Sequence, residues 1–318
     1  MTDFLARTLE LAEQGRGTTH PNPVVGAVVV QDGRIVGHGW HTRPGEPHAE
    51  ILALQEAGEK ARGATLYVSL EPCAHHGRTP PCADAILAAG VTRVVAAVGD
   101  PDPRTNGRGF ERLRAAGIEV ELPGGELEWT ARVQNEGFRT VAALGRPFVT
   151  YKAAVTLDGR VTVPGQRWVS SEESRRRVHE LRGRSDAVAV GMGTVRADNP
   201  LLTARGVEVP RQPRRLAFGR GPLPEGSELE LLSRPLEEEL ARLSAEGVQT
   251  LLLEGGPTLA ASFLAAGLVD KLMLFVAPRL SGSGPRAFGE LPEPLQVVRL
   301  DVDAVGGDAV LTAYLREP

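Results

Sequence analysis

The feature that most constrains the fold of this 318-residue chain is a regular alternation of strand-like and helix-like segments. Short apolar runs rich in valine, leucine and alanine are followed by helical patterns of roughly ten residues. Helical patterns in the first half end at a glycine, a frequent C-terminal signal of a helix. Such alternation is typical of layered α/β domains, in which helices cover the faces of a sheet.

The first half contains one clear hairpin signal, Asp32-Gly33, within the strand-like run 24–40. The second half has its hairpin signal at Gly306-Gly307. Other strands are predicted at 64–70, 93–100, 118–122, 147–155, 186–190, 214–218, 250–255 and 271–278. Helices are predicted at 3–14, 48–58, 82–90, 109–117, 127–145, 171–183, 235–246 and 257–266, and a surface loop at 206–226.

The length of the chain predicts two domains, because a single hydrophobic core rarely grows to 318 residues. The segment Gly145-Arg146-Pro147 follows the helix predicted at 127–145 and precedes a new strand. We therefore place the domain boundary there and expect one domain over 1–145 and another over 146–318.

Composition narrows the class of protein. Hydrophobic residues make up 42% and charged residues 24% of the chain, as in ordinary globular proteins. The N-terminus has neither the basic start nor the apolar run of a signal peptide, and no stretch predicts a membrane helix. We expect a cytoplasmic protein without a membrane partner. The net charge is −4 and the first half is the more acidic, which argues against nucleic acid as a partner.

Both cysteines of the chain follow a His-Ala-Glu sequence, and the order predicts a zinc site. His48 and Glu50 open a predicted helix, Cys73 follows Pro72 after a predicted strand, and Cys82 opens the next helix. This is the order of the zinc nucleobase deaminases. His48, Cys73 and Cys82 would be three zinc ligands, which leaves the fourth tetrahedral position to water, as in catalytic sites. Glu50 would then be the acid–base residue that moves protons.

Simpler interpretations of the same residues stay open. A His-Ala-Glu sequence is common by chance, and cysteines are often buried as small apolar side chains. His75 and His76 could compete as ligands, since they lie in the eight-residue loop between the cysteines. That loop is longer than the two residues of the usual P-C-x-x-C pattern and would bring His76 to the substrate. Asn22, between two prolines, would offer its amide to a base edge.

The second half contains glycine-rich turns, but they do not form a Rossmann fingerprint. In "GMGTVRAD", Arg196 stands where the third glycine is required, and no acidic residue follows at a strand end. The turn Glu254-Gly255-Gly256-Pro257 joins a strand to a helix whose first backbone N–H groups suit a phosphate. An ordinary tight turn explains the same residues equally well.

Several motifs together closely resemble the bifunctional deaminase–reductases of riboflavin biosynthesis. They are "THPNPVVGAVVV", "HAE", "EPCAHHGRTPPC", "RPFVTYKAAVTLDGRV", "GMGTVRADNPLLTAR" and "LLEGGPTLAASFLAAGLVDKL". The resemblance implies a cytidine-deaminase-like three-layer α/β/α domain followed by a dihydrofolate-reductase-like α/β domain. It implies zinc-dependent deamination of 2,5-diamino-6-(5-phosphoribosylamino)pyrimidin-4(3H)-one, then reduction by NADPH of the ribosyl group of 5-amino-6-(5-phosphoribosylamino)uracil to ribityl.

The resemblance also implies roles for residues of the second domain. It implies NADPH contacts at Ala154, Trp168, Thr194, Asp198, Gly256, Pro257, Thr258, Leu259, Ala260, Ala261 and Ser262. It implies substrate contacts at Gln166, Arg182, Leu202, Arg205 and Glu254. Lys152 and Asp158 match a strand–turn motif of the family, and a structural pairing is equally plausible for them.

Two positions depart from the family pattern. Gln166 stands where the family usually has serine, and Phe218-Gly219 replaces an Asp-Ser that contacts the cofactor. We therefore expect weak discrimination against NADH. An RNA-editing zinc deaminase with an accessory domain is the alternative function, and a zinc-stabilised binding module is a third. A homo-oligomer is possible.

Overall fold

The computed structural model describes residues 2–74, 81–102, 105–209, 211–291 and 293–318. It divides into two compact units, Met1–Leu144 together with Pro318, and Gly145–Glu317. Among the described residues, no helix has both the length and the apolar character needed to cross a membrane.

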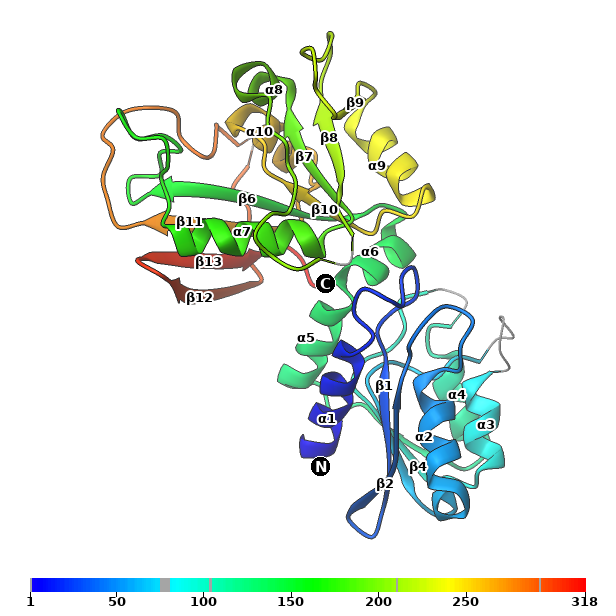
Figure 1. The fold of residues 1–318 in the computed structure, drawn as a ribbon. Coiled ribbons are helices and arrows are strands. Elements are labelled where there is room, and N and C mark those ends of the chain that lie inside the picture. Colours follow the sequence, from blue (N-terminus) through cyan, green and yellow to red (C-terminus); the bar gives the residue numbers. More distant parts are fainter. Residues whose placement is uncertain (1, 75–80, 103–104, 210, 292) are drawn as a thin grey trace. The chain divides into compact units, whose positions relative to one another are not determined.

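The first unit is built on a five-stranded sheet in the order β2-β1-β3-β4-β5 (Figure 1). β1 runs antiparallel to β2 and β3, and β3, β4 and β5 run parallel. The turn between β1 and β2 has positive φ at both Asp32 and Gly33, which confirms the predicted hairpin. The strands are Gly26–Gln31 (β1), Arg34–Trp40 (β2), Thr65–Val68 (β3), Arg93–Ala96 (β4) and Glu119–Glu121 (β5).

Helices cover both faces of this sheet because its strands are apolar on both sides. Ala27 and Val29 of β1 belong to the core under α2, α3 and α4. Val28 and Val30 belong to the opposite core, under α1 and α5. The expected three-layer α/β/α domain is confirmed. Its helices are Thr2–Glu13 (α1), Ala49–Ala57 (α2), Cys82–Ala88 (α3), Arg108–Ala115 (α4), Gly125–Gln134 (α5) and Glu136–Leu144 (α6), and a 3-10 turn spans Gly58–Ala61.

The single helix expected over 127–145 is wrong. The structure breaks it at Asn135 into α5 and α6. The Asn135 amide donates to the carbonyl of Val24 at 2.9 Å and its oxygen accepts the Val24 N–H at 2.8 Å. Because this pair ties the helix junction to the chain entering β1, a contact distant in sequence ends the helix.

The second unit contains an eight-stranded sheet in the order β12-β13-β11-β6-β10-β7-β8-β9 (Figure 1). The pairs from β11 through β9 are parallel, and β13 runs antiparallel to β11 and β12. The strands are Phe148–Thr156 (β6), Ala187–Gly191 (β7), Arg214–Phe218 (β8), Glu230–Leu232 (β9), Thr250–Leu253 (β10), Lys271–Ala277 (β11), Arg299–Val305 (β12) and Asp308–Tyr314 (β13).

In the described part of this unit, four helices pack on the two faces of the sheet. Leu240 of α9 and Phe263 of α10 share one core with β6 and β10. Met192 of α8 and Val178 of α7 belong to cores on the other face. The helices are Glu172–Arg184 (α7), Met192–Asp198 (α8), Leu236–Ala245 (α9) and Pro257–Ala265 (α10). The predicted elements did not include α8 and β9, and both are short.

Candidate active sites

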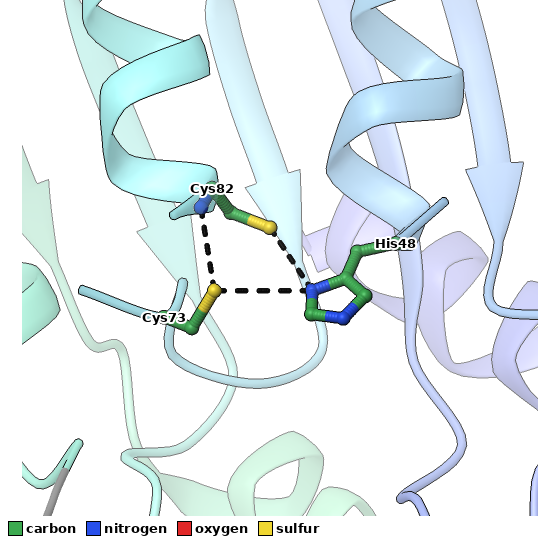
Figure 2. A group of neighbouring side chains, drawn as sticks. All are labelled: His48, Cys73 and Cys82. Carbon is green, nitrogen blue, oxygen red and sulfur yellow. Dashed lines mark hydrogen bonds between the residues drawn. The ribbon is translucent and has the colours of Figure 1, made fainter. Parts of the chain in front are cut away.

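Three predicted ligands of the first unit lie together (Figure 2). His48 has extended backbone angles and caps the N-terminus of α2, and Cys82 is the first residue of α3. Cys73 lies in the segment after β3. His48 Nδ1 is 3.1 Å from Cys82 Sγ and 3.8 Å from Cys73 Sγ. Two helix starts and one strand end thus bring three ligand atoms to one point.

The donor set fits zinc. Zinc–sulfur and zinc–nitrogen bonds at a tetrahedral angle place nitrogen and sulfur roughly 3.5 Å apart, and the observed distances bracket that value. Hydrogen bonds from Cys82 and then His48 lower the pKa of the Cys73 thiol to about 4. The pKa of Cys82 is raised, first because its thiol donates to Cys73. A zinc ion held here would bind the two cysteines as thiolates and would displace their protons.

Two of the carboxyl groups that line the cavity beside these ligands have a raised pKa, one on a buried side chain and one on a half-buried side chain. Glu50 lies in the first turn of α2, is only 3% exposed, and is not part of the ligand cluster. Burial raises its pKa above the usual value for a glutamate. Burial also raises the pKa of Asp100, to about 6. A carboxyl group whose proton is held more tightly than usual is suited to general acid–base work near neutral pH.

Asn22 points into the same cavity and is oriented by a histidine that was not predicted. The Asn22 Nδ2 is 3.0 Å from His41 Nε2, and His41 Nδ1 is 3.3 Å from the Pro47 carbonyl. Because a carbonyl can only accept, Nδ1 carries the hydrogen and Nε2 accepts from the Asn22 amide. Burial lowers the pKa of His41, consistent with this neutral form. The Asn22 oxygen remains an acceptor for a ligand.

The cavity has a volume of about 420 Å³. Its walls combine several carboxyl groups, Glu50 and Asp100 among them, with His48, Cys73 and apolar surface from Leu70 and Phe138. His76, the predicted substrate residue of the loop between the cysteines, and His75 lie outside the described residues.

A second residue that was not predicted, Glu71, holds the Cys73 segment in place. Its carboxylate accepts four backbone N–H groups, those of Asp100, Gly107, Gly109 and Phe110, at 3.0–3.3 Å. Glu71 therefore links the chain just before Cys73 to the start of α4. The sequence "SLEPC" could have indicated this role, because a glutamate that directly follows an apolar strand is often buried and then needs hydrogen-bond partners.

In the second unit, Glu254 joins two of the predicted residues. Arg182 of α7 holds it through two bonds, Nε to Oε1 at 2.6 Å and Nη2 to Oε2 at 3.1 Å. Lys152 of β6 lies 3.4 Å from Oε2. Burial opposes ionisation of Glu254, but the charges of Lys152 and Arg182 outweigh it and hold the pKa at about 2. Glu254 is therefore a carboxylate that neutralises much of the Arg182 charge.

Leu202 and Arg205 lie on the segment that follows α8. The Leu202 side chain is 3% exposed and belongs to an apolar core, and its φ is +54°. Any contact of Leu202 with a ligand therefore falls to its backbone. Arg205 is exposed, and its guanidinium has no ion-pair partner among the residues that the structure describes.

The start of α10, the predicted phosphate-binding turn, has no side-chain cap. Gly256 caps the helix without a side-chain bond, and Pro257 occupies the first turn. A Cβ on Gly255 would lie 2.9 Å from the end of the Leu259 side chain, so a larger residue there would have to push that side chain aside. Thr194 Oγ1 lies 3.8 Å from where a Cβ on Gly256 would be. The first N–H groups of such a helix have no partner within it and suit a dinucleotide phosphate.

The remaining predicted residues lie around the same unit. Ala260 is fully buried, so it contributes to helix packing rather than a ligand surface. Trp168 is 52% exposed, and the guanidinium groups of Arg167 and Arg175 lie 5.0 and 5.1 Å from its ring centre. Gln166 accepts a hydrogen bond from Arg279. Further predicted positions are Ala154 in β6, Asp198 at the end of α8, and Thr258, Leu259, Ala261 and Ser262 in α10.

Known families and proteins resemble both units. The family described as "Cytidine and deoxycytidylate deaminase zinc-binding region" matches residues 1–98. The "RibD C-terminal domain" family matches residues 147–311, about half of the chain. The riboflavin biosynthesis protein RibD of Aquifex aeolicus is 42% identical over 97% of this chain and 97% of that protein. RibD of Escherichia coli is 42% identical over 91% of this chain and 90% of that protein.

Solved structures agree with these sequence matches. Acinetobacter baumannii RibD superposes with a TM-score of 0.84 at 37% identity, covering 98% of each chain. The diaminohydroxyphosphoribosylaminopyrimidine deaminase/5-amino-6-(5-phosphoribosylamino)uracil reductase of Thermotoga maritima superposes with a TM-score of 0.82 at 35% identity. It covers 98% of this chain and 97% of that one. The chain belongs to the RibD family, the bifunctional deaminase and reductase enzymes of riboflavin biosynthesis.

Proposed function

We propose that residues 1–145 deaminate 2,5-diamino-6-(5-phosphoribosylamino)pyrimidin-4(3H)-one. We further propose that residues 146–318 then reduce the ribosyl group of 5-amino-6-(5-phosphoribosylamino)uracil to ribityl. The observation that carries the proposal is the His48, Cys73 and Cys82 cluster beside buried Glu50 in a cavity of about 420 Å³. The Thermotoga maritima relative is named for both reactions. Because the family match spans both units, we set aside the RNA-editing and binding-module alternatives.

In the deaminase unit, His48, Cys73 and Cys82 would hold zinc. Zinc bound there would lower the pKa of a water molecule toward ~7. The Glu50 carboxylate takes a proton from the attacking water and gives it to the amino group, which leaves as ammonia. Asn22, held by His41, accepts a hydrogen bond from the pyrimidinone and orients the ring. Glu71 fixes the position of the nearby Cys73, because its carboxylate accepts four backbone hydrogen bonds.

In the reductase unit, the accessible residues from Gly256 to Ser262, at the start of α10, would bind phosphate groups of NADPH, which supplies hydride to the sugar, while Ala260 packs the helix. Trp168, Thr194, Asp198 and Ala154 would contact the rest of the cofactor. Arg205 binds the substrate phosphate, because its charge is unpaired in the described part of the chain. Glu254 accepts from sugar hydroxyls in the orientation that Arg182 and Lys152 impose. Leu202 contributes its backbone, and Gln166 an amide.

Two assays on one variant test the proposal. Wild-type enzyme is expected to release ammonia from the diamino substrate without NADPH and to oxidise NADPH with the deaminated one. Glu50→Gln keeps the shape but removes the base, so deamination should fall at least ~100-fold. Zinc content and NADPH oxidation should stay near wild type. Collapse of both activities in a folded variant would contradict the division of the reactions at residue 145.

A further inference from the structure

We propose that His179 is a positioning residue for the reductase, acting by accepting the backbone N–H of Arg205 at its Nδ1. This inference rests on the proposed function in one respect, the assignment of Arg205 to the substrate phosphate. His179 lies on α7, one turn before Arg182, so both side chains face the Leu202–Arg205 segment.

Two groups compete for the same ring nitrogen. His179 Nδ1 is 3.2 Å from the Arg205 nitrogen and 3.2 Å from the Thr203 carbonyl oxygen. A protonated Nδ1 donates to the carbonyl, whereas an unprotonated Nδ1 accepts from the amide. It cannot do both at once, so the partners of these two backbone groups decide the tautomer.

The hydrogen-bond partners favour acceptance from Arg205. The Thr203 carbonyl already accepts from Arg182 Nη1 at 3.1 Å. His179 supplies the one acceptor within the described part of the protein that the Arg205 N–H contacts. The hydrogen of the neutral ring then lies on Nε2.

The charges around His179 favour the same neutral ring. Its pKa is lowered first by burial and then by the positive charge of Arg182. The Thr203 carbonyl and the Glu254 carboxylate act in the opposite direction, while Arg205 adds to the lowering. A neutral His179 at neutral pH is what the bond from Arg205 requires.

The hydrogen bond to His179 holds the backbone of Arg205, whereas the neighbouring Ala204 is held by other contacts. Ala204, the preceding residue, is held independently by Gln212, whose amide accepts from its N–H and donates to its carbonyl, both at 2.9 Å. Removing the His179 acceptor therefore releases the Arg205 backbone while Ala204 stays fixed. The exposed Arg205 side chain then loses its direction, which weakens substrate binding without touching the reacting sugar.

A matched pair of variants separates the hydrogen bond from the shape of the side chain. His179→Leu keeps a branch at Cγ but removes the acceptor, whereas His179→Asn places an amide oxygen at the position of Nδ1. Arg177→Ala, an exposed change on the same helix, is the control. In assays with the deaminated phosphoribosyl substrate and NADPH, His179→Leu should raise the substrate KM about fivefold, the effect of one lost hydrogen bond.

The pattern of effects is specific to positioning. In His179→Leu, kcat and the KM for NADPH should stay unchanged, and His179→Asn and Arg177→Ala should behave as wild type. In an Arg205→Ala background, His179→Leu should add nothing, because the residue it positions is gone. An unchanged substrate KM in His179→Leu, or the same fivefold effect on top of Arg205→Ala, would overturn the proposal.

Amide hydrogen exchange tests the bond without any activity. The Arg205 amide should exchange at least about fivefold faster in His179→Leu than in wild type, and His179→Asn should restore its protection. Protection that is equal in all three proteins would overturn the inference. If exchange behaves as expected but wild-type enzyme does not reduce the phosphoribosyl substrate, the proposed function fails and the positioning contact stands.

Discussion

Arg182 and Arg205 carry the same charge in opposite surroundings. Arg182 is bound at two points by Glu254, whereas Arg205 is exposed and has no carboxylate partner among the described residues. A phosphate therefore meets an available guanidinium mainly at Arg205. The resemblance treats the two arginines alike, and only their contacts separate them.

We expect Arg205→Ala to raise the reductase KM for its phosphorylated substrate by about 10- to 100-fold. The loss of one charge-assisted bond, about 1.5–3 kcal/mol, accounts for this range. Arg182→Ala should also raise KM and in addition destabilise the unit, because it leaves the largely covered Glu254 carboxylate with Lys152 alone. Steady-state kinetics and urea unfolding separate the two effects, with exposed Arg184→Ala as the control. An unchanged KM in both variants would show that the substrate assignment is wrong.

Glu254 should make the second unit sensitive to acid. Its folded pKa of about 2 lies below the unfolded value of 4.5, so its ionisation stabilises the fold above pH 4.5. That contribution, on the order of 3 kcal/mol, is lost as the pH falls from 4.5 through about 2. Hydrogen exchange of β10 at pH 6 and pH 3 should show the loss in wild type and in exposed Glu208→Gln. Glu254→Gln should be less stable at pH 6 and should lose less stability than wild type between pH 6 and pH 3, because other carboxylates of the unit still respond to acid; a loss equal to that of wild type would refute the assignment.

At the scale of elements, the start of α4 packs directly against Pro72, the residue before Cys73. A Cβ on Gly109, the second residue of α4, would lie 1.9 Å from the Pro72 carbonyl oxygen. Pro72 directly precedes Cys73, and the same turn donates to Glu71. Any side chain at 109 must therefore move α4 or the cysteine segment.

Gly109→Ala should destabilise the deaminase unit by about 1–3 kcal/mol or more, the range for overpacking, and should lower zinc retention. Urea unfolding and elemental analysis measure both effects. Gly193→Ala is the matched control, because no described atom outside its own helix backbone and chain neighbours lies within 4 Å of the added Cβ. A Gly109→Ala protein with wild-type stability and zinc content would show that the close approach does not constrain the metal segment.

At the scale of the whole molecule, the zinc cluster and Glu254 belong to separately packed units. Dialysis against a chelator should therefore abolish ammonia release while NADPH oxidation with the deaminated substrate stays near its starting rate. Adding zinc back should restore ammonia release, because the ligands His48, Cys73 and Cys82 all lie in the first unit. Parallel loss of both activities would contradict independent sites.

The sequence by itself determined the fold class, the family and the grouping of His48 with the two cysteines. Each rests on short-range information: hydrophobic period, turn residues such as Asp32-Gly33, and motif spacing around His48 and the cysteines. Most of the predicted strands are present in the structure because a strand buried on both faces of a sheet needs a continuous apolar run, which the sequence shows directly. Most of the predicted helices are present because their hydrophobic period is also local.

Tertiary structure alone decided how those residues are held. The break at Asn135 depends on Val24, Glu71 depends on backbone groups of 100–110, and Arg182 meets a carboxylate at position 254. These partners lie tens of residues apart or more, and no local period or spacing records which of them will meet. Because a buried polar group must find a partner wherever the fold supplies one, its orientation and pKa are properties of the packed chain rather than of its neighbours in sequence.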